Sequence, residues 1–496
     1  MSDEAWREYR RALPATVADS ARTRLLQDHV PLMKERLDLG RQAGALPRAG
    51  EPVYRWVRYK EAYSPRLVRE ILDELVPRPA VRSGRVGPVL YDPMVGSGTS
   101  LLVAAERGMP ALGADLMPYA TFITSAMIRW RQADPAVVQQ IADNVLSGYA
   151  AMPGREHLDV PAAGWAFAPA VARALSQLLN ALDRAPAGVN RDLVRLAILS
   201  AVEQVSYTVK DGTSVRRRLP GASARPGRPG QQRKEMDASD VVAGVRQRVA
   251  TVVEDLEQGR PISGRQPTDA SALSQKGMVL PVPVSARTGL RNASRLAVVK
   301  ADAREWRPAR ESCGVVVFSP PYPNRYDYSA IYQLELALGD FVSGAGELRR
   351  LRKELLRSHL EAPPRDEYRM ELPALREFLA AVNAGRLKGD QSGRVLRMVA
   401  GFFEDMTDVL LRVAEALRPG GSVGLVVSTQ TYLGQHLPTD LLLAEVGRSA
   451  GLEVQALWVV RFKGVASQQR LMASSLGRES VLLMRKPSSS RRRSRR

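Results

Sequence analysis

The chain is poor in the side chains from which covalent cross-links and metal sites are built. It has one cysteine, Cys313, among 496 residues, which excludes a disulfide framework and a zinc site made of several thiolates. The four histidines are far apart and lack the spacing of paired metal ligands: His29, His157, His359 and His436. We therefore expect no metal cofactor.

Long apolar segments are missing as well. The longest apolar runs have about the length of a strand and are too short to cross a membrane. Residues 2–11 are polar and charged, unlike the start of a secretory signal. We expect a cytoplasmic protein with no membrane partner.

Acidic residues are outnumbered by basic ones. Lys and Arg number 72 against 52 Asp and Glu, a net charge of +20, whereas the hydrophobic fraction of 45% is ordinary for a globular protein. Such an excess favours a polyanionic partner, with nucleic acid first and an anionic membrane second. The alternative is a basic surface that is merely solvated.

The sequence does contain an alternation of strand and helix patterns. Short apolar runs that end at turn residues or acids predict strands at 89–91, 111–114, 296–299, 315–318 and 422–427. Two later runs predict an antiparallel hairpin at a sheet edge, at 454–460 and 480–484. These patterns indicate an α/β fold with a doubly wound sheet, whose ligands lie at the carboxyl ends of the strands.

Strand patterns stop between the second and third predicted strands, which divides the chain. Residues 51–130 and 292–486 are predicted to form the α/β domain, 131–291 a large, mainly helical insertion, 1–50 an N-terminal helical arm and 487–496 a disordered basic tail. Within the insertion, helical patterns cover 169–182, 191–207 and 239–256.

The insertion also carries a segment rich in Arg, Gly and Pro, from Lys210 to Lys234, which predicts a mobile basic loop. Its arginines Arg216, Arg217 and Arg218 could follow DNA phosphates, which gives affinity without base readout. The insertion is therefore a candidate target-recognition region. A purely structural helical insertion is the alternative.

A glycine-rich turn, Gly96 to Gly98, follows the first predicted strand. Glycines let the backbone approach a ligand closely, and the following helix aims its first amides at that ligand. Asp115, at the end of the next strand, is placed to accept hydrogen bonds from ribose hydroxyls. Alone, the turn fits a nucleotide-like ligand or an ordinary tight turn. The third glycine of a dinucleotide fingerprint and the Gly-Lys-Ser/Thr of a P-loop are both missing.

A second motif, Ser319-Pro320-Pro321-Tyr322, follows the strand predicted at 315–318. Two prolines cannot continue a sheet, so they hold the Ser319 side chain and the Pro320 carbonyl in fixed positions. Both are acceptors suited to the N–H groups of an exocyclic base amine, and Tyr322 can stack on a base that has left the duplex. A proline-rich strand exit with a packed tyrosine is the alternative.

The segment Asp92-Pro93-Met94-Val95-Gly96-Ser97-Gly98-Thr99 resembles the cofactor motif of S-adenosylmethionine-dependent, amino-methylating DNA methyltransferases, with Met94 in place of the usual Phe. The resemblance implies a class I methyltransferase-like sheet and S-adenosylmethionine as the cofactor. It places the following residues around the cofactor: Asp92, Pro93, Gly96, Gly98 and Thr99. It further implies that Asp115 binds the ribose and Asp302 the adenine amino group, although Asp302 could equally be a turn residue.

The helix start at Ser64 is a weaker candidate for the cofactor site. Ser64 is a good N-cap and Pro65 a good first helical residue. Tyr63 and Ser64 loosely match the segment that packs against the methionine end of the cofactor in this family. The helix N-terminus could hold the methionine carboxylate.

The target base is the least defined part of the resemblance. Serine in the first position of Ser319–Tyr322 resembles the N4-cytosine group, whereas the N6-adenine group more often has Asp or Asn there. However, the cofactor motif precedes the catalytic motif, the reverse of many N4-cytosine enzymes. Cytosine-C5 methylation is excluded because it needs a nucleophilic thiolate and Cys313 precedes the strand. We favour N4 of cytosine, with N6 of adenine as the alternative.

Residues beyond the catalytic motif are candidates for contacts with the nucleic acid. The extension Asn324-Arg325-Tyr326-Asp327-Tyr328 resembles the same methyltransferases, and its residues could line the base pocket or contact the backbone, with Arg325 and Tyr328 as the main candidates. DNA is the expected partner. Methylation of a base in RNA and a non-catalytic nucleic-acid-binding role remain alternatives. No nuclease motif is present, so a restriction or defence-system subunit would be a separate chain.

Overall fold

The structure is a computed structural model that describes residues 20–40, 51–60, 62–76, 87–155, 157–210, 214–217, 236–259, 296–364, 371–385, 391–463 and 477–488. The expectations for Arg218, for most of the basic loop and for residues 489–496 of the tail lie outside these ranges.

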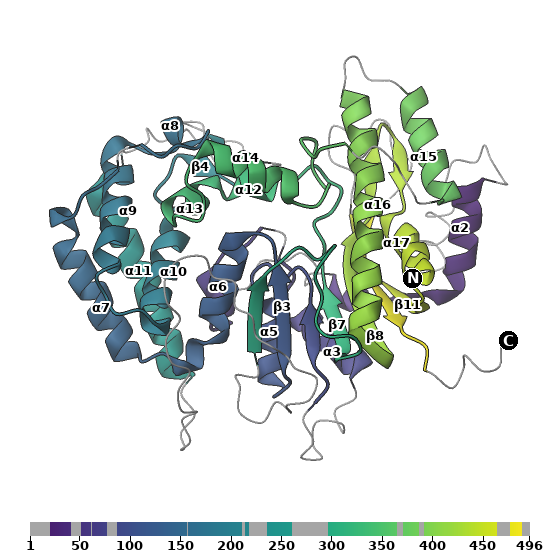
Figure 1. The fold of residues 1–496 in the computed structure, drawn as a ribbon, viewed down its shortest axis with the longest axis horizontal. Coiled ribbons are helices and arrows are strands. Elements are labelled where there is room, and N and C mark those ends of the chain that lie inside the picture. Colours follow the sequence, from purple (N-terminus) through teal and green to yellow (C-terminus); the bar gives the residue numbers. More distant parts are fainter. Residues whose placement is uncertain are drawn as a thin grey trace.

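The described residues form a mixed eight-stranded sheet at the centre of the molecule (Figure 1). Its strands are β1 (Met33–Glu35), β2 (Leu90–Asp92), β3 (Ala111–Asp115), β6 (Leu296–Lys300), β7 (Cys313–Phe318), β8 (Leu417–Ser428), β11 (Glu453–Lys463) and β12 (Gly477–Arg485). Their order across the sheet is β1-β11-β12-β8-β7-β2-β3-β6.

The strand order reverses between β2 and β7. From β2 the chain continues outward to β3 and β6 on one side, and later to β7 and β8 on the other, with parallel pairing throughout. β12 pairs antiparallel with both β8 and β11, which confirms the predicted α/β sheet with a hairpin. A reversal of this kind opens a crevice at the carboxyl ends of the two strands that flank it.

The predicted hairpin position at the sheet edge is wrong. β1 pairs in parallel with β11, with Met33 opposite Leu457, so residues of the predicted helical arm form the edge strand. Three residues are too few to show a period-2 pattern in the sequence. The pairing covers backbone groups that an exposed β11 would leave open. Cys313, expected before its strand, is the first residue of β7.

Helices cover both faces of the sheet. Alternate residues of β7 divide between two cores: Val315 and Val317 belong to the core on one face, and Val316 and Phe318 to the core on the other. The first face carries α3 (Pro65–Leu75), α5 (Thr99–Glu106) and α6 (Pro118–Ile128), and the second carries α16 (Gln391–Ala416) and α17 (Thr439–Ser449). Burial on both faces explains the continuous apolar character of β7.

The residues between β3 and β6 form a helical lobe, at the left of Figure 1. It consists mainly of α7 (Pro135–Gly148), α8 (Ala163–Ala166), α9 (Pro169–Leu182), α10 (Val189–Ala201) and α11 (Ala238–Gln258). α9 spans the predicted residues, whereas α10 ends six residues before the predicted end at 207.

Two of the arginines expected in a loop lie on a strand instead. β4 (Thr208–Val209) pairs antiparallel with β5 (Arg216–Arg217), and both arginine side chains are exposed. Backbone pairing across this short ribbon orders a segment whose composition favours a loop. The ribbon presents Arg216 and Arg217 on the surface of the lobe.

The remaining helices follow β7 or precede the sheet: α2 (Ala21–His29), α12 (Tyr328–Ile331), α13 (Gln333–Leu338), α14 (Ala345–Glu354) and α15 (Pro373–Ala384). A small hairpin, β9 (Gln430–Tyr432) and β10 (Gln435–Leu437), lies between β8 and α17. Within the ranges described above, no helix has both the length and the apolar character needed to cross a membrane.

A fully buried ion pair ties α17 to β12. Arg478 Nε lies 2.6 Å from Asp440 Oδ2, and Ser480 Oγ donates to the same oxygen at 2.7 Å. Burial alone raises the pKa of Asp440, but the charge and hydrogen bonds of Arg478 outweigh it and hold this pKa below its ordinary value. The pair therefore stabilises the fold only while Asp440 is ionised.

Replacing Asp440 by Asn should lower the free energy of unfolding by about 3–5 kcal/mol at neutral pH, because Arg478 would remain buried without a counter-charge. Urea denaturation of both proteins measures the difference. It should shrink as the pH falls below 3.8, the ordinary pKa of Asp, since the wild-type carboxyl then protonates as well. Glu371→Gln is the matched control, because the Glu371–Arg376 pair is exposed and should contribute less than about 1 kcal/mol.

Candidate active site

A pocket with about 1000 Å³ of space, part of it open to solvent, lies at the carboxyl ends of β7, β2, β3 and β6. Among its lining residues are most of the predicted site residues: Tyr63, Pro93, Gly96, Thr99, Asp115, Asp302, Ser319, Pro320, Pro321, Tyr322 and Tyr328. Four others do not line it: Ser64, Asp92, Gly98 and Arg325. The two motifs, far apart in the sequence, therefore share one cavity.

The glycine turn needs its two glycines for backbone reasons. Gly96 has φ +52° and Gly98 has φ +80°, the left-handed region that other residues rarely adopt. A Cβ on Gly98 would lie 2.9 Å from Thr124 Cγ2, a residue of α6. Packing against α6 is therefore a sufficient reason for glycine at position 98, and a ligand contact there stays a prediction.

The Asp92 side chain holds the start of this turn through hydrogen bonds. This side chain is completely buried and accepts hydrogen bonds from the Met94 N–H at 2.9 Å, from the Tyr63 hydroxyl at 3.2 Å and from the Ser100 hydroxyl. Burial raises the pKa of Asp92 to about 7. Asp92 thus joins β2, α5 and the Tyr63 segment, which makes it a positioning residue.

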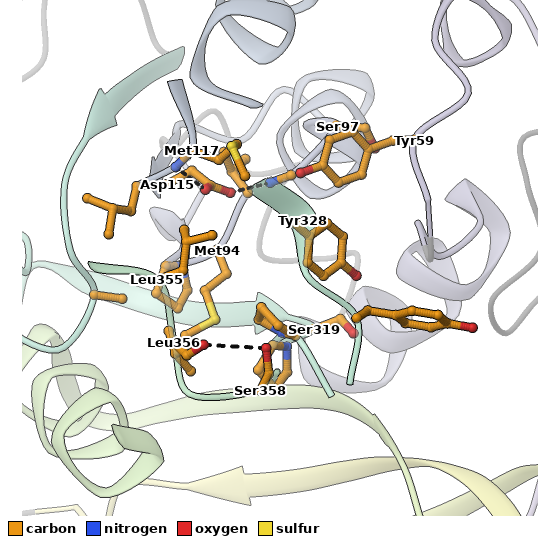
Figure 2. A pocket seen from close by; sticks show the side chains of 18 of the residues that line it. Tyr59, Met94, Ser97, Asp115, Met117, Ser319, Tyr328, Leu355, Leu356 and Ser358 are labelled. Atoms are coloured by element: carbon orange, nitrogen blue, oxygen red, sulfur yellow. Dashed lines mark hydrogen bonds between the residues drawn. The ribbon is translucent and has the colours of Figure 1, made fainter. Parts of the chain in front are cut away.

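Asp115 does face the pocket (Figure 2). Its two oxygens accept from the Gly96 N–H and the Met117 N–H, each at 2.9 Å. Burial raises the pKa of Asp115 to about 6. Because each carboxylate oxygen has two acceptor positions, Asp115 can accept further hydrogen bonds from a ligand.

Asp302 lies two residues beyond the carboxyl end of β6, the strand at one edge of the sheet. Its Oδ1 accepts from the Arg304 N–H at 2.9 Å, and its Oδ2 lies 2.5 Å from Arg304 Nη2. Arg304 also reaches Asp405 of α16 at 3.4 Å. Asp302 is thus both a turn residue and part of the pocket wall, with its charge compensated by Arg304.

The second motif begins directly after β7. The Ser319 hydroxyl donates to the Tyr322 hydroxyl at 3.2 Å, and Tyr322 is 7% exposed. The next residue, Pro323, accepts a hydrogen bond from the Tyr432 hydroxyl through its carbonyl. In this view Ser319 and Asp115 lie at opposite ends of the pocket (Figure 2).

An aromatic wall connects the two ends. Tyr59 stacks on Tyr328 and Tyr332, with ring centroids 6.2 Å and 4.9 Å apart, and Lys60 Nζ lies 4.9 Å above the Tyr326 ring. Tyr326 and Tyr328 both belong to the extension at residues 324–328 that was expected to line a base pocket, whereas Lys60 was missed.

Two predicted residues have structural roles outside the pocket. The Ser64 hydroxyl accepts from the Leu67 N–H at 3.3 Å, which confirms the N-cap of α3 but uses the group expected to meet a cofactor. The Arg325 guanidinium packs 5.4 Å from the centre of the Tyr432 ring. Their predicted ligand contacts therefore receive no support from the geometry.

A segment after α14 closes the pocket and had no signal in the sequence. Leu355, Leu356, Ser358 and His359 all line the cavity (Figure 2 labels the first three). Its position depends on contacts with α16, which local patterns do not reveal. Over the part of the chain that the structure describes, no group of three or more His, Cys, Asp or Glu side chains is arranged to hold a metal ion.

The two reasons for glycine at position 98 can be separated by mutation. Gly98→Ala should destabilise the protein more than Gly108→Ala, because Gly108 also has a positive φ (+66°) but nothing within 4 Å of its Cβ position. The backbone strain should cost about 1–2 kcal/mol in both, and the contact with Thr124 should add about 1–3 kcal/mol in Gly98→Ala alone. Urea midpoints measure both. Equal losses would contradict the packing explanation.

Known proteins resemble this chain along most of its length. It is 25% identical over 443 residues to the Type II methyltransferase M.AvaI of Nostoc sp. (strain PCC 7120), covering 84% of this chain and 83% of that protein. It is 24% identical over 478 residues to the Type II methyltransferase M.BsoBI of Geobacillus stearothermophilus, covering 88% and 86%.

Comparison with family models and solved structures adds little. No protein-family model matches the chain. The structure of the cyclase SpnF aligns with 95% of this chain and 98% of its own at 10% identity, with a TM-score of 0.29, which is too low to establish a shared fold. The sequence comparison is the informative one: over more than four fifths of its length, this chain is similar in sequence to Type II methyltransferases.

Proposed function

We propose that the chain transfers a methyl group from S-adenosylmethionine to the exocyclic amino group of a base in DNA, with N4 of cytosine favoured over N6 of adenine. The observation that carries the proposal is the convergence of the glycine turn, Asp115 and the Ser319–Tyr322 motif on one pocket. Similarity to Type II methyltransferases supports methyl transfer. The strand order, which reverses between β2 and β7, fits a class I methyltransferase-like sheet.

The pocket residues near Asp115 fit this cofactor. Met94, Met117 and Leu355 provide apolar surfaces for an adenine ring, and the Asp115 carboxylate has free acceptor positions for vicinal ribose hydroxyls. When bound, S-adenosylmethionine supplies an electrophilic methyl group. The chain contributes the orientation of that group and the exclusion of water around it.

The pocket residues near Ser319 fit the base amine. The amine is a weak nucleophile because its lone pair is delocalised into the ring. Since Ser319 donates its proton to Tyr322, the lone pairs of Ser319 remain available to accept an amine N–H, and the Pro320 carbonyl is the second acceptor. Two acceptors on the amine favour a tetrahedral, nucleophilic nitrogen, so catalysis needs positioning and polarisation without a covalent intermediate.

DNA must reach this pocket with the target base turned out of the helix. Tyr322 and Tyr328 provide aromatic surfaces on which such a base can stack. We assign the exposed Arg216 and Arg217 of the β4–β5 ribbon to contacts with DNA phosphates, and the helical lobe to target recognition. Ser319 supports cytosine as the target.

The Asp115 assignment predicts a pH-dependent affinity for S-adenosylmethionine. Ribose hydroxyls donate more strongly to an ionised carboxylate than to a protonated one, so affinity should rise with pH up to about 6, where Asp115 titrates, and then level off. Asp115→Asn should bind about ten- to hundredfold more weakly and lose this rise. Isothermal calorimetry between pH 5 and 8 measures both. A wild-type rise that persists in Asp115→Asn would assign the titration to Asp92 instead.

The Ser319 assignment predicts a catalytic defect without a binding defect. Ser319→Ala should lower kcat for DNA methylation about ten- to hundredfold, because one acceptor for the amine is lost, and should leave the affinity for S-adenosylmethionine unchanged. Ser312→Ala is the matched control, since Ser312 lies before β7 at the opposite end of the strand and bonds the Ala309 carbonyl. Equal kcat values for Ser319→Ala and wild type would contradict the role.

The overall proposal is tested by methylation-aware sequencing and base analysis of DNA from cells that make the wild-type chain or Ser319→Ala. N4-methylcytosine in the wild type alone supports the proposal, and N6-methyladenine would reassign the base. No methylated base in either would contradict DNA methylation. Methyl transfer to RNA in a parallel assay would then favour the RNA alternative, and failure to bind S-adenosylmethionine would favour a non-catalytic role.

A further inference from the structure

His359 is a buried polar side chain with an unmet hydrogen-bonding requirement. It is 2% exposed and lines the pocket, yet neither ring nitrogen has a hydrogen-bond partner among the described residues. Leaving a buried donor or acceptor unpaired is costly, so such groups are rare in folded proteins. Their presence in a ligand pocket points to a ligand that completes them.

The backbone around His359 is held rigidly. The Arg357 N–H donates to Asp405 Oδ2 at 2.9 Å, and the Arg357 guanidinium forms a buried ion pair with the same carboxylate. The Ser358 carbonyl accepts from the Arg325 N–H at 3.1 Å. These contacts fix the main chain immediately before His359. Mobility of the segment is therefore not the reason that the His359 ring lacks hydrogen bonds.

His359 belongs to the catalytic end of the pocket. Arg325, which holds Ser358, lies on the loop that follows the Ser319–Tyr322 motif. Burial lowers the pKa of His359 below its ordinary value, and the Arg352 cation lowers it further, whereas the charge of Asp327, on the same loop, and the nearby Arg352 backbone carbonyl raise it in part. The ring is therefore neutral at physiological pH and offers one N–H donor and one acceptor.

We infer that His359 reads the target base by donating its ring N–H to the ring nitrogen next to the amine, N3 of cytosine or N1 of adenine. In a duplex this nitrogen accepts a hydrogen bond from the paired base, and turning the base out of the helix breaks that bond. His359 replaces the lost donor. The inference rests on the proposed function and names a specificity-determining contact within it.

The experiment pairs a protein variant with a substrate analogue. The substrate is a duplex with the site located by sequencing, and its analogue carries 3-deazacytosine (or 1-deazaadenine) at the target, which replaces the acceptor nitrogen by C–H. For the wild type, the analogue should lower kcat/KM about ten- to hundredfold. His359→Phe should show a similar loss on the natural duplex and no further loss on the analogue.

The comparison isolates the contact, because weaker pairing of the deaza base in the duplex affects wild type and variant equally. If His359→Phe does not fold, His359→Leu, which also lacks a donor, should give the same pattern. His436→Gln is the matched control: His436 is buried with unpaired ring nitrogens but does not line this pocket, so it should retain the wild-type sensitivity to the analogue.

Three results would overturn the inference: a wild type that is insensitive to the analogue, a His359 variant that remains as sensitive as the wild type, or a His359 variant that loses S-adenosylmethionine affinity tenfold or more in calorimetry. The last result would place the side chain at the cofactor. A wild type that methylates no duplex DNA would instead contradict the proposed function, so the two failures are distinguishable.

Discussion

Parallel pairing between β2 and β7 is the constraint on which the pocket depends. Leu90 lies opposite Val315 and Tyr91 opposite Val316, so the two strands end at the same edge of the sheet. The glycine turn follows β2 at this edge and Ser319 follows β7 there, although more than two hundred residues separate them in the sequence. The helical lobe enters between β3 and β6 and leaves this pairing intact.

A chain of buried charges connects the walls of the pocket to the helix behind the sheet. Asp302 pairs with Arg304, and Arg304 and Arg357 both pair with Asp405, which is 1% exposed on α16. Removing Asp405 would take the carboxylate away from the buried Arg357, and removing Arg304 would take the cation away from Asp302, so the two shared residues hold the others in one arrangement. These pairs join the strand end at β6 to the Leu355–His359 segment, and both carry residues that line the pocket.

The sequence predicts those parts of the site that depend on local backbone chemistry. The glycines with positive φ, the proline pair and the acids at strand ends are recognisable because their residue types are required wherever the chain turns in this way. β1 could not be predicted, since three residues show no period and their strand depends on β11. His359 was visible only as an isolated histidine, because its role depends on Asp405 and Arg325, which are distant in sequence.

The same distinction explains why the packing reason for Gly98 could not be predicted. A glycine after a strand suggests room for a ligand, but Thr124 of α6 takes that room, and its hydroxyl also donates to the Gly96 carbonyl at 3.0 Å. The turn is therefore shaped by packing from one side and by Asp92 from the other. The two glycine amides are held within the protein as well, since the Gly96 N–H donates to Asp115 and the Gly98 N–H donates to the Val95 carbonyl at 2.8 Å.

Burial of the Asp92 and Asp115 carboxyl groups lowers the stability of the fold at physiological pH. Burial raises the pKa of Asp92 to about 7 and of Asp115 to about 6, from 3.8 for each, so the folded chain binds protons more tightly than the unfolded chain. The contribution of these groups to stability is therefore greatest in acid and declines as the pH rises from about 4 to 7. A ligand that donates hydrogen bonds to Asp115 favours its ionised form and offsets part of the cost. The glycine turn thus binds such a ligand most strongly under the conditions in which it is itself least stable.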